Sequence, residues 1–307
     1  MKRRRAAGGR VLGLAAVLVV VAPRGGEEAP EIAEGTRALY RGDYEQARAL
    51  ASEYLKMRPD VSLAHILLAR AEIAQGKYEP AYESLRKALE LDPTNVDALY
   101  YLERVGTILS QIEFRRLLET APDSFRAHQL MAESYRDQHH DNEAEKEYQA
   151  ALKANPRSVE ALDALGELMR SEYRFDEALD YYARAAKLAP RDYTSAYGAG
   201  ACYMFRESRQ RAIESFRRAR AIDPRSAPAH LALGDALLRE GQTSAAVAEL
   251  KAATELIPGM RQAYTLLARA YQKLGQTREA QQTLEKEQQL AGEEIKTREQ
   301  TLGSDRR

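Results

Sequence analysis

The sequence predicts an all-α protein, a solenoid of about eight helix-turn-helix repeats. Three observations support this fold class. Prolines recur at a nearly constant interval, apolar and small residues recur between them at helical spacing, and the composition favours helices, with 17 tyrosines, 5 phenylalanines and no tryptophan. A chain of 307 residues ordinarily suggests two globular domains. A repeat array removes that expectation, because each repeat packs mainly on its neighbours.

Residues 1–25 are predicted to be a targeting segment and not part of the fold. Basic residues between Lys2 and Arg10 precede an apolar stretch at residues 11–22, which is the order found in a signal peptide or an N-terminal membrane anchor. The stretch is shorter than the roughly 20 residues of a spanning helix, and the charge precedes it, so we expect export of the chain. The expected place is the periplasm or the outward face of the inner membrane.

The sequence does not decide whether this segment is cleaved. Ala22 is small enough for a signal peptidase, but Pro23 follows it directly and would hinder cutting. A cleaved signal and an uncleaved anchor that attaches residues 11–22 to the membrane are both consistent with the sequence. A cytoplasmic protein with a basic N-terminus is the alternative.

Residues 26–288 carry the repeats. Proline stops one helix and sets the turn into the next, because it lacks an amide donor and disfavours helix in the residue before it. The spacing of the prolines is constant except in the third repeat, which places repeat boundaries near residues 60, 94, 123, 157, 191, 225 and 259. The prolines themselves are Pro59, Pro93, Pro122, Pro156, Pro190, Pro224 and Pro258.

The pattern inside each repeat resembles the tetratricopeptide repeat (TPR) family. That family has a 34-residue unit in which an aromatic residue, Leu-Gly, Tyr, Ala, Phe and Pro follow one another. The last complete unit shows the pattern in Tyr264, Leu267, Ala268, Tyr271, Ala280 and Leu284. The resemblance implies a right-handed α-solenoid whose first helices line a concave groove. Small residues such as Gly166, Gly200 and Gly234 are then required where the two helices of a pair approach closely.

Glycines also predict the turn inside the repeat. Gly42, Gly76, Gly241 and Gly275 follow the first helix of their units, where a left-handed residue ends a helix.

The third repeat, between Pro93 and Pro122, is five residues shorter than the others. The apolar pattern fits a first helix from Val96 to about Ile108 and a second from Ser110 to Thr120. We therefore predict two helices with a tight or nearly absent connection. A kink with a function and a tolerated deletion are both consistent with this.

The repeat pattern fades after residue 288. The polar stretch at 289–307 predicts a capping helix that covers the last pair, followed by a disordered tail.

Composition and motifs argue against several function classes. The 46 basic and 46 acidic residues cancel, so no global field attracts nucleic acid. No phosphate loop, nucleophile elbow or metalloprotease motif is present, so we expect no enzyme, no cofactor and no metal site. Cys202, the single cysteine, is expected to be a packed core residue. The cluster from Asp137 to Asp141 is interpreted as a solvated turn, with a metal site through His139 and His140 as the weaker alternative.

The resemblance also implies which residues face a partner. Carried over unit by unit, the groove stripe has two zones rich in aromatic, apolar and arginine side chains, the types that anchor interfaces. The predicted partner-binding residues are Ile66, Arg70, Ile73, Tyr100, Arg104, Tyr197, Met204, Phe205, Leu238 and Arg269. Between the zones, Glu160, Asp163 and Glu167 are interpreted as a solvated acidic face rather than a site for basic peptides.

The resulting hypothesis is a scaffold that binds an extended peptide or a partner's helix in its groove. A cell-envelope assembly or secretion factor that acts through its convex surface and N-terminal anchor is the alternative. A regulatory module for a separate enzyme would use the same surface as the first hypothesis. The partner's identity and the oligomeric state do not follow from the sequence.

Overall fold

The computed structural model describes residues 29–304, and in that range it has fifteen helices and no strand. The predicted all-α class and the consecutive helix-turn-helix packing are confirmed. Within the described range, no helix is long and apolar enough to cross a membrane. The predicted signal or anchor at residues 1–25 lies outside the described residues.

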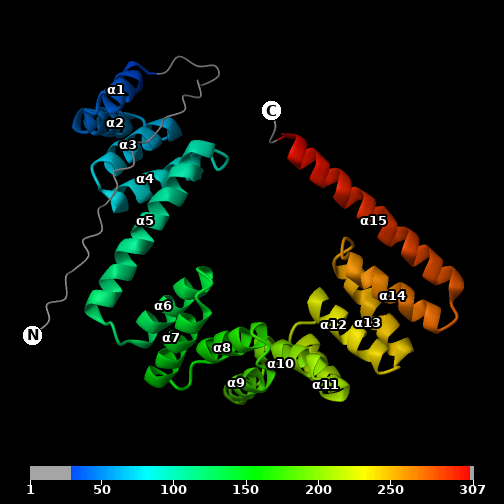
Figure 1. Cartoon of the computed structure of the whole chain (residues 1–307). Coiled ribbons are helices and arrows are strands. Elements are labelled where there is room, and N and C mark those ends of the chain that lie inside the picture. The colour runs from blue at the N-terminus through cyan, green and yellow to red at the C-terminus, as the bar shows by residue number, and fades with distance from the viewer. Residues whose placement is uncertain (1–28, 305–307) are drawn as a thin grey trace, which may run out of the picture. The chain divides into compact units, whose positions relative to one another are not determined.

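The helices form two compact units, one ending at Glu113 and one beginning at Phe114. In the first unit, α1 packs on α2 and α3 packs on α4, and α1 also lies beside α3 (Figure 1). Its helices are α1 (Pro30–Arg41), α2 (Tyr44–Met57), α3 (Ser62–Ala74), α4 (Tyr78–Leu91) and the first part of α5 (Val96–Thr120).

In the second unit each helix packs on the next along the chain from α6 to α15 (Figure 1). Helices with even numbers are the first of their pairs, and helices with odd numbers are the second. They are α6 (Phe125–Asp137), α7 (Asp141–Ala154), α8 (Val159–Ser171), α9 (Phe175–Leu188), α10 (Tyr193–Phe205), α11 (Arg209–Ile222), α12 (Ala227–Arg239), α13 (Thr243–Leu256), α14 (Arg261–Lys273) and α15 (Thr277–Ser304).

The turns inside the repeats all contain one left-handed residue. The four predicted glycines have φ between 72° and 84°, which confirms their role. In three other repeats the same position is taken by His139, Tyr173 and Glu207, with φ of 58°, 63° and 56°. A side chain there costs roughly 1–2 kcal/mol relative to glycine, so these three turns are strained.

Five of the turns between repeats combine proline with a helix cap. Two residues after the proline, a short polar side chain accepts a hydrogen bond from a backbone N–H in the first turn of the next helix, which satisfies an otherwise free donor. The five caps are Asn95, Ser124, Ser158, Asp192 and Ser226. Asp192 is the only one of these five capping residues with an ionisable side chain.

Close contact inside the pairs explains the small residues of the repeat. A Cβ added to Gly166 would lie 2.5 Å from the Tyr182 ring, and one added to Gly234 would lie 2.6 Å from Leu250. Gly200 meets Phe216 in the same way. Each of these three glycines of a first helix therefore faces a large side chain of the second helix, as predicted.

The prediction of two helices in the third repeat is wrong. Residues Val96–Thr120 form the single helix α5. The shortened stretch has no residue with positive φ, and Gly106 stays helical with no atom within 4 Å of an added Cβ. Since nothing there ends the helix, the backbone hydrogen bonds continue. Ala98 and Val105 pack with α3 and α4, whereas Ile112 is 37% exposed.

The predicted boundary at residue 288 is also corrected. Helix α15 runs from Thr277 to Ser304 without interruption, so the polar residues after 288 extend the second helix of the last pair and do not form a separate capping helix. Arg261 of α14 pairs with Glu287 and Glu294 on α15. These ion pairs fasten the start of the extension to the preceding helix.

Candidate partner-binding surface

The first helices of successive repeats lie beside one another in each unit. In the first unit α1 lies beside α3, and in the second unit α8 contacts α10, α10 contacts α12 and α12 contacts α14. We call the surface that these helices form in each unit the first-helix face of that unit. It is the surface on which the resemblance placed a partner.

In the first unit the first-helix face carries a cluster that we call the Tyr–Arg patch, made of Tyr40, Arg70, Tyr100 and Tyr101. The guanidinium carbon of Arg70 lies 5.6 Å from the centre of the Tyr40 ring and 5.5 Å from that of Tyr101. Tyr100 stands edge-on to Tyr101 at 5.3 Å and is 57% exposed. Tyr40 is 48% exposed. Three first helices thus present an arginine held between two tyrosine rings.

In the second unit aromatic side chains gather at the turn ends of two repeats, in a cluster that we call the aromatic edge. Phe175 and Phe205 stack at 5.0 Å with an angle of 11° between the rings, and Tyr173 stands edge-on to Phe175 at 6.0 Å. Phe205 is 62% exposed and Tyr173 is 74% exposed. Tyr173 also occupies one of the strained left-handed turns.

Helix α8 carries a polar network on its side toward α10. Glu167 forms an ion pair with Arg170 and accepts a hydrogen bond of 2.5 Å from the Tyr182 hydroxyl. The Tyr182 ring lies against both Gly166 and Gly198. Burial and the neighbouring Glu167 raise the pKa of Tyr182, so its hydroxyl stays protonated and donates.

One carboxylate beside this network is left without a partner. Asp163 on α8 is 9% exposed, and its Oδ1 is buried with no hydrogen-bond partner. Burial, followed by the negative charge of Asp192, a hydrogen bond between the two carboxyl groups and the charge of Glu167, raises the pKa of Asp163 to about 7. Asp192 is itself the cap of α10, accepting a bond of 2.6 Å from the Ser195 amide. The interpretation of this region as a solvated acidic face is therefore wrong for Asp163.

Two family models match the chain over most of both units. A model described as tetratricopeptide repeat matches residues 32–96 and 130–193, and a model described as the middle TPR-like domain of cilia and flagella-associated protein 70 matches residues 162–291. The chain is a tetratricopeptide repeat protein. TPR proteins are generally non-catalytic scaffolds that bind proteins or peptides.

Solved structures of other TPR proteins share the fold. MamA is 23% identical with a TM-score of 0.52, over 54% of this chain and 97% of MamA. YrrB, described as a TPR protein with an unusual peptide-binding site, is 20% identical with a TM-score of 0.52, over 58% of this chain and 91% of YrrB.

Among curated relatives, sperm-associated antigen 1 of Mus musculus is 36% identical over 114 residues. The match covers 35% of this TPR protein and 12% of the mouse protein. The rat protein matches over the same length at 34% identity.

The structure distributes the predicted partner-binding residues over three environments. Ile66 and Leu238 are 3% and 2% exposed in the hydrophobic core, so their assignment to the groove is corrected. Ile73, Tyr197 and Met204 are partly buried and pack against the core. The remaining five are half-buried or exposed, and they are Arg70, Tyr100, Arg104, Phe205 and Arg269.

Tyr197 supports the fold as well as the surface. Its ring stacks on Tyr193 at 5.7 Å and packs on Phe216 at 5.5 Å. Replacement by alanine would therefore disturb the packing between α10 and α11, and Tyr197 is a poor position for a test of binding alone.

The histidine cluster lies in the turn between α6 and α7, as expected, with His139 left-handed and His140 as the residue before α7. No group of three side chains in the described part of the TPR protein could hold a metal ion. Cys202 is fully buried in the core, and burial raises its pKa to about 11, so the thiolate nucleophile is suppressed.

Several surface residues escaped the sequence analysis. Tyr40 and Tyr101 flank Arg70, Tyr173 and Phe175 extend the cluster of Phe205, and Asp192 lies beside Asp163. An alignment of the repeats on their prolines identifies one of these residues, Asp192. Among the caps that follow each proline, Asp192 is the only carboxylate, so the signal was present in the repeat alignment.

Proposed function

We propose that this TPR protein binds an extended peptide or a helix of a partner protein on its first-helix face. The observation that carries the proposal is the Tyr–Arg patch, where side chains from α1, α3 and α5 converge on one surface. Tyrosine and arginine are the residue types that contribute most to binding energy at interfaces. The patch is also held in place before a partner arrives, which lowers the entropy cost of binding.

Site-specific crosslinking in the native host tests this proposal. A photoreactive amino acid at Tyr100 is expected to capture a partner, and the same substitution at Tyr44 is the control. Tyr44 is 38% exposed in the same unit but belongs to the second helix α2. Capture at Tyr44 without capture at Tyr100 would reject the first-helix face as the binding surface.

The captured partner then allows a quantitative test. Combined replacement Tyr40→Ala and Tyr100→Ala is expected to weaken its binding by at least about tenfold, because a hot-spot aromatic contributes roughly 2 kcal/mol or more. Tyr44→Ala should leave binding unchanged. The far-UV circular dichroism of all three proteins should agree, since both patch tyrosines are about half exposed.

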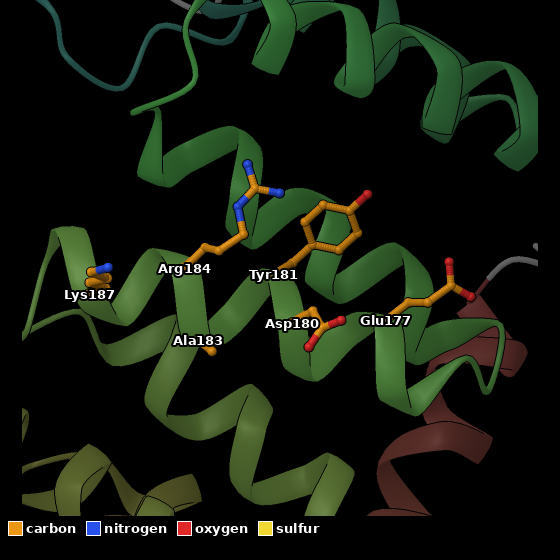
Figure 2. Close-up of a pocket in the computed structure, with 6 residues that line it drawn as sticks. All are labelled: Glu177, Asp180, Tyr181, Ala183, Arg184 and Lys187. Atoms are coloured by element: carbon orange, nitrogen blue, oxygen red, sulfur yellow. The ribbon is translucent and has the colours of Figure 1, made fainter.

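One observation favours action through the second helices instead. A shallow depression lies on α9, and Figure 2 shows Tyr181 and Arg184 side by side among its lining residues. The guanidinium carbon of Arg184 lies 5.6 Å from the centre of the Tyr181 ring. All lining residues come from α9 alone, and they are Glu177, Asp180, Tyr181, Ala183, Arg184 and Lys187. A cell-envelope assembly or secretion factor could use this surface, and partner capture from Tyr181 alone would favour it.

We further propose that the chain is exported, on the basis of the basic residues before Arg10 and the apolar stretch at residues 11–22. A fusion of residues 1–40 to alkaline phosphatase should be active, because that reporter requires export. Replacement of the early lysine and arginines by glutamate should abolish the activity. An inactive wild-type fusion would favour the cytoplasmic alternative.

A further inference from the structure

We propose that Asp163 and Asp192 form a subsite for a positively charged side chain, lysine or arginine, of an extended peptide bound to the first-helix face of the second unit. The inference rests on the proposed function, since it names one feature of the partner. It follows from a buried carboxyl group with one unpartnered oxygen, at a place where two first helices meet.

The geometry leaves Asp163 in need of a ligand. It lies on α8 with 9% of its surface exposed, and its Oδ1 has no hydrogen-bond partner. A buried polar atom without a partner costs roughly 1–3 kcal/mol, and more when it is charged. Asp192, at the start of α10, adds a second carboxyl group, and one of its oxygens is used to cap that helix.

The described residues supply no ion-pair partner for these two carboxyl groups. Neither Asp163 nor Asp192 forms an ion pair with any residue of the described range, as the ion pairs of the structure show. The nearby Arg170 pairs with Glu167 through Nη2, whereas its Nε is buried without a hydrogen-bond partner. The two acidic groups therefore lack an ion-pair partner in the described range, and an external positive charge would stabilise their ionised forms.

Comparison with the neighbouring repeats shows that this arrangement is local. When the repeats are aligned, the position of Asp163 is taken by Gln129 and Tyr197, and the position of Asp192 by Ser158 and Ser226. These equivalents are neutral. The fold thus needs no carboxylate at either position, which favours a role in binding over a role in the helix stack.

The chemistry favours a cationic side chain over a metal ion. A divalent cation requires about six oxygen ligands, and no group of three ligand residues occurs in the part of the chain that the structure describes. Two carboxyl groups suffice for an ammonium or a guanidinium group. A third arrangement, one proton shared between the two carboxyls, is an outcome of the test.

The test is a selection of peptides from a random peptide display library on the full chain. The wild type is compared with Asp163→Asn and with the control Glu160→Gln, which alters an exposed carboxylate on the same helix. Lysine or arginine should be enriched at one position of the peptides selected on the wild type and on Glu160→Gln. The enrichment should vanish on Asp163→Asn.

A selected peptide then gives the affinity. Replacing its basic residue by glutamine should weaken binding to the wild type by at least about tenfold and should hardly change binding to Asp163→Asn. Asp192→Asn should give a smaller loss, and asparagine still caps α10.

The outcomes separate this inference from the proposed function. Peptides without a basic preference, or with the same preference on Asp163→Asn, would overturn the cation subsite and leave peptide binding intact. Either result would favour the arrangement in which Asp163 and Asp192 share one proton. Failure of every clone to bind the wild type would count against the proposed function and the subsite together.

Discussion

Asp163→Asn should make the protein more stable at pH 8 and change its stability little at pH 5. The pKa of Asp163 is raised to about 7, mainly by burial, while the unfolded chain has a pKa of about 3.9. Between these values the folded state binds more protons than the unfolded state, so stability falls as pH rises. Integration from pH 5 to pH 8 gives a loss of about 2–3 kcal/mol in the wild type through this one group. The asparagine variant does not titrate and should lack this loss.

Urea unfolding followed by circular dichroism at the two pH values measures the difference. Because repeat arrays unfold in nearest-neighbour steps, hydrogen exchange of the α8 amides should accompany it and report on the site itself. Glu160→Gln, whose side chain is 65% exposed in the wild type, controls for the loss of any carboxylate on α8. Parallel pH profiles for wild type and Asp163→Asn would refute the reasoning, since they would show that Asp163 keeps its ordinary pKa.

Four further predictions follow from single positions. Tyr173→Gly should stabilise the protein by about 1 kcal/mol in urea unfolding, because it relieves the left-handed strain at φ 63°, and a loss would show that the exposed ring contributes more than the strain. Gly166→Ala should destabilise by roughly 1–3 kcal/mol because its Cβ would meet the Tyr182 ring at 2.5 Å, and an unchanged urea midpoint would contradict this packing. Gly106→Ala should stabilise by about 0.5–1 kcal/mol because α5 is continuous there, whereas destabilisation would indicate a turn. Cys202 should resist alkylation at pH 8 until the protein unfolds, since it is 0% exposed, and rapid labelling of the native protein would contradict its burial.

The predicted stabilisation by Asp163→Asn relates the stability of the fold to the proposed cation subsite. A buried carboxylate that lowers stability is the kind of group that binding sites retain, because stability and function often compete. The variant should therefore gain stability and lose the preference for basic peptides. The two measurements are independent, and together they distinguish a binding site from an accident of packing.

The helix pairs were predictable because their causes are local. A regularly spaced proline stops each second helix, the glycines supply the left-handed turn, and Gly166 or Gly234 allows two helices to approach. Each of these effects acts over a few residues or within one pair. The third repeat was predicted wrongly because the apolar pattern of two helices persisted there, while the turn residue that separates them was missing.

The surface was less predictable than the fold, because exposure depends on side chains from other repeats. Ile66 and Leu238 share the predicted stripe with Tyr100 and Phe205, yet the first two are buried and the last two are exposed. Small shifts in how neighbouring helices pack decide whether a residue of the stripe lies in the buried core or on the exposed surface. A periodic pattern does not carry that information.

By itself, the sequence determined the class of the protein, the helix pairs and the places of the turns, since these depend on backbone preferences and on spacing along the chain. Only the tertiary structure decided that Arg70 lies between Tyr40 and Tyr101, and that Asp163 is buried beside Asp192 with its Oδ1 unpartnered. The physical reason is distance. These groups lie in different repeats, far apart in sequence, and the free energy of a charge depends on which atoms surround it in space.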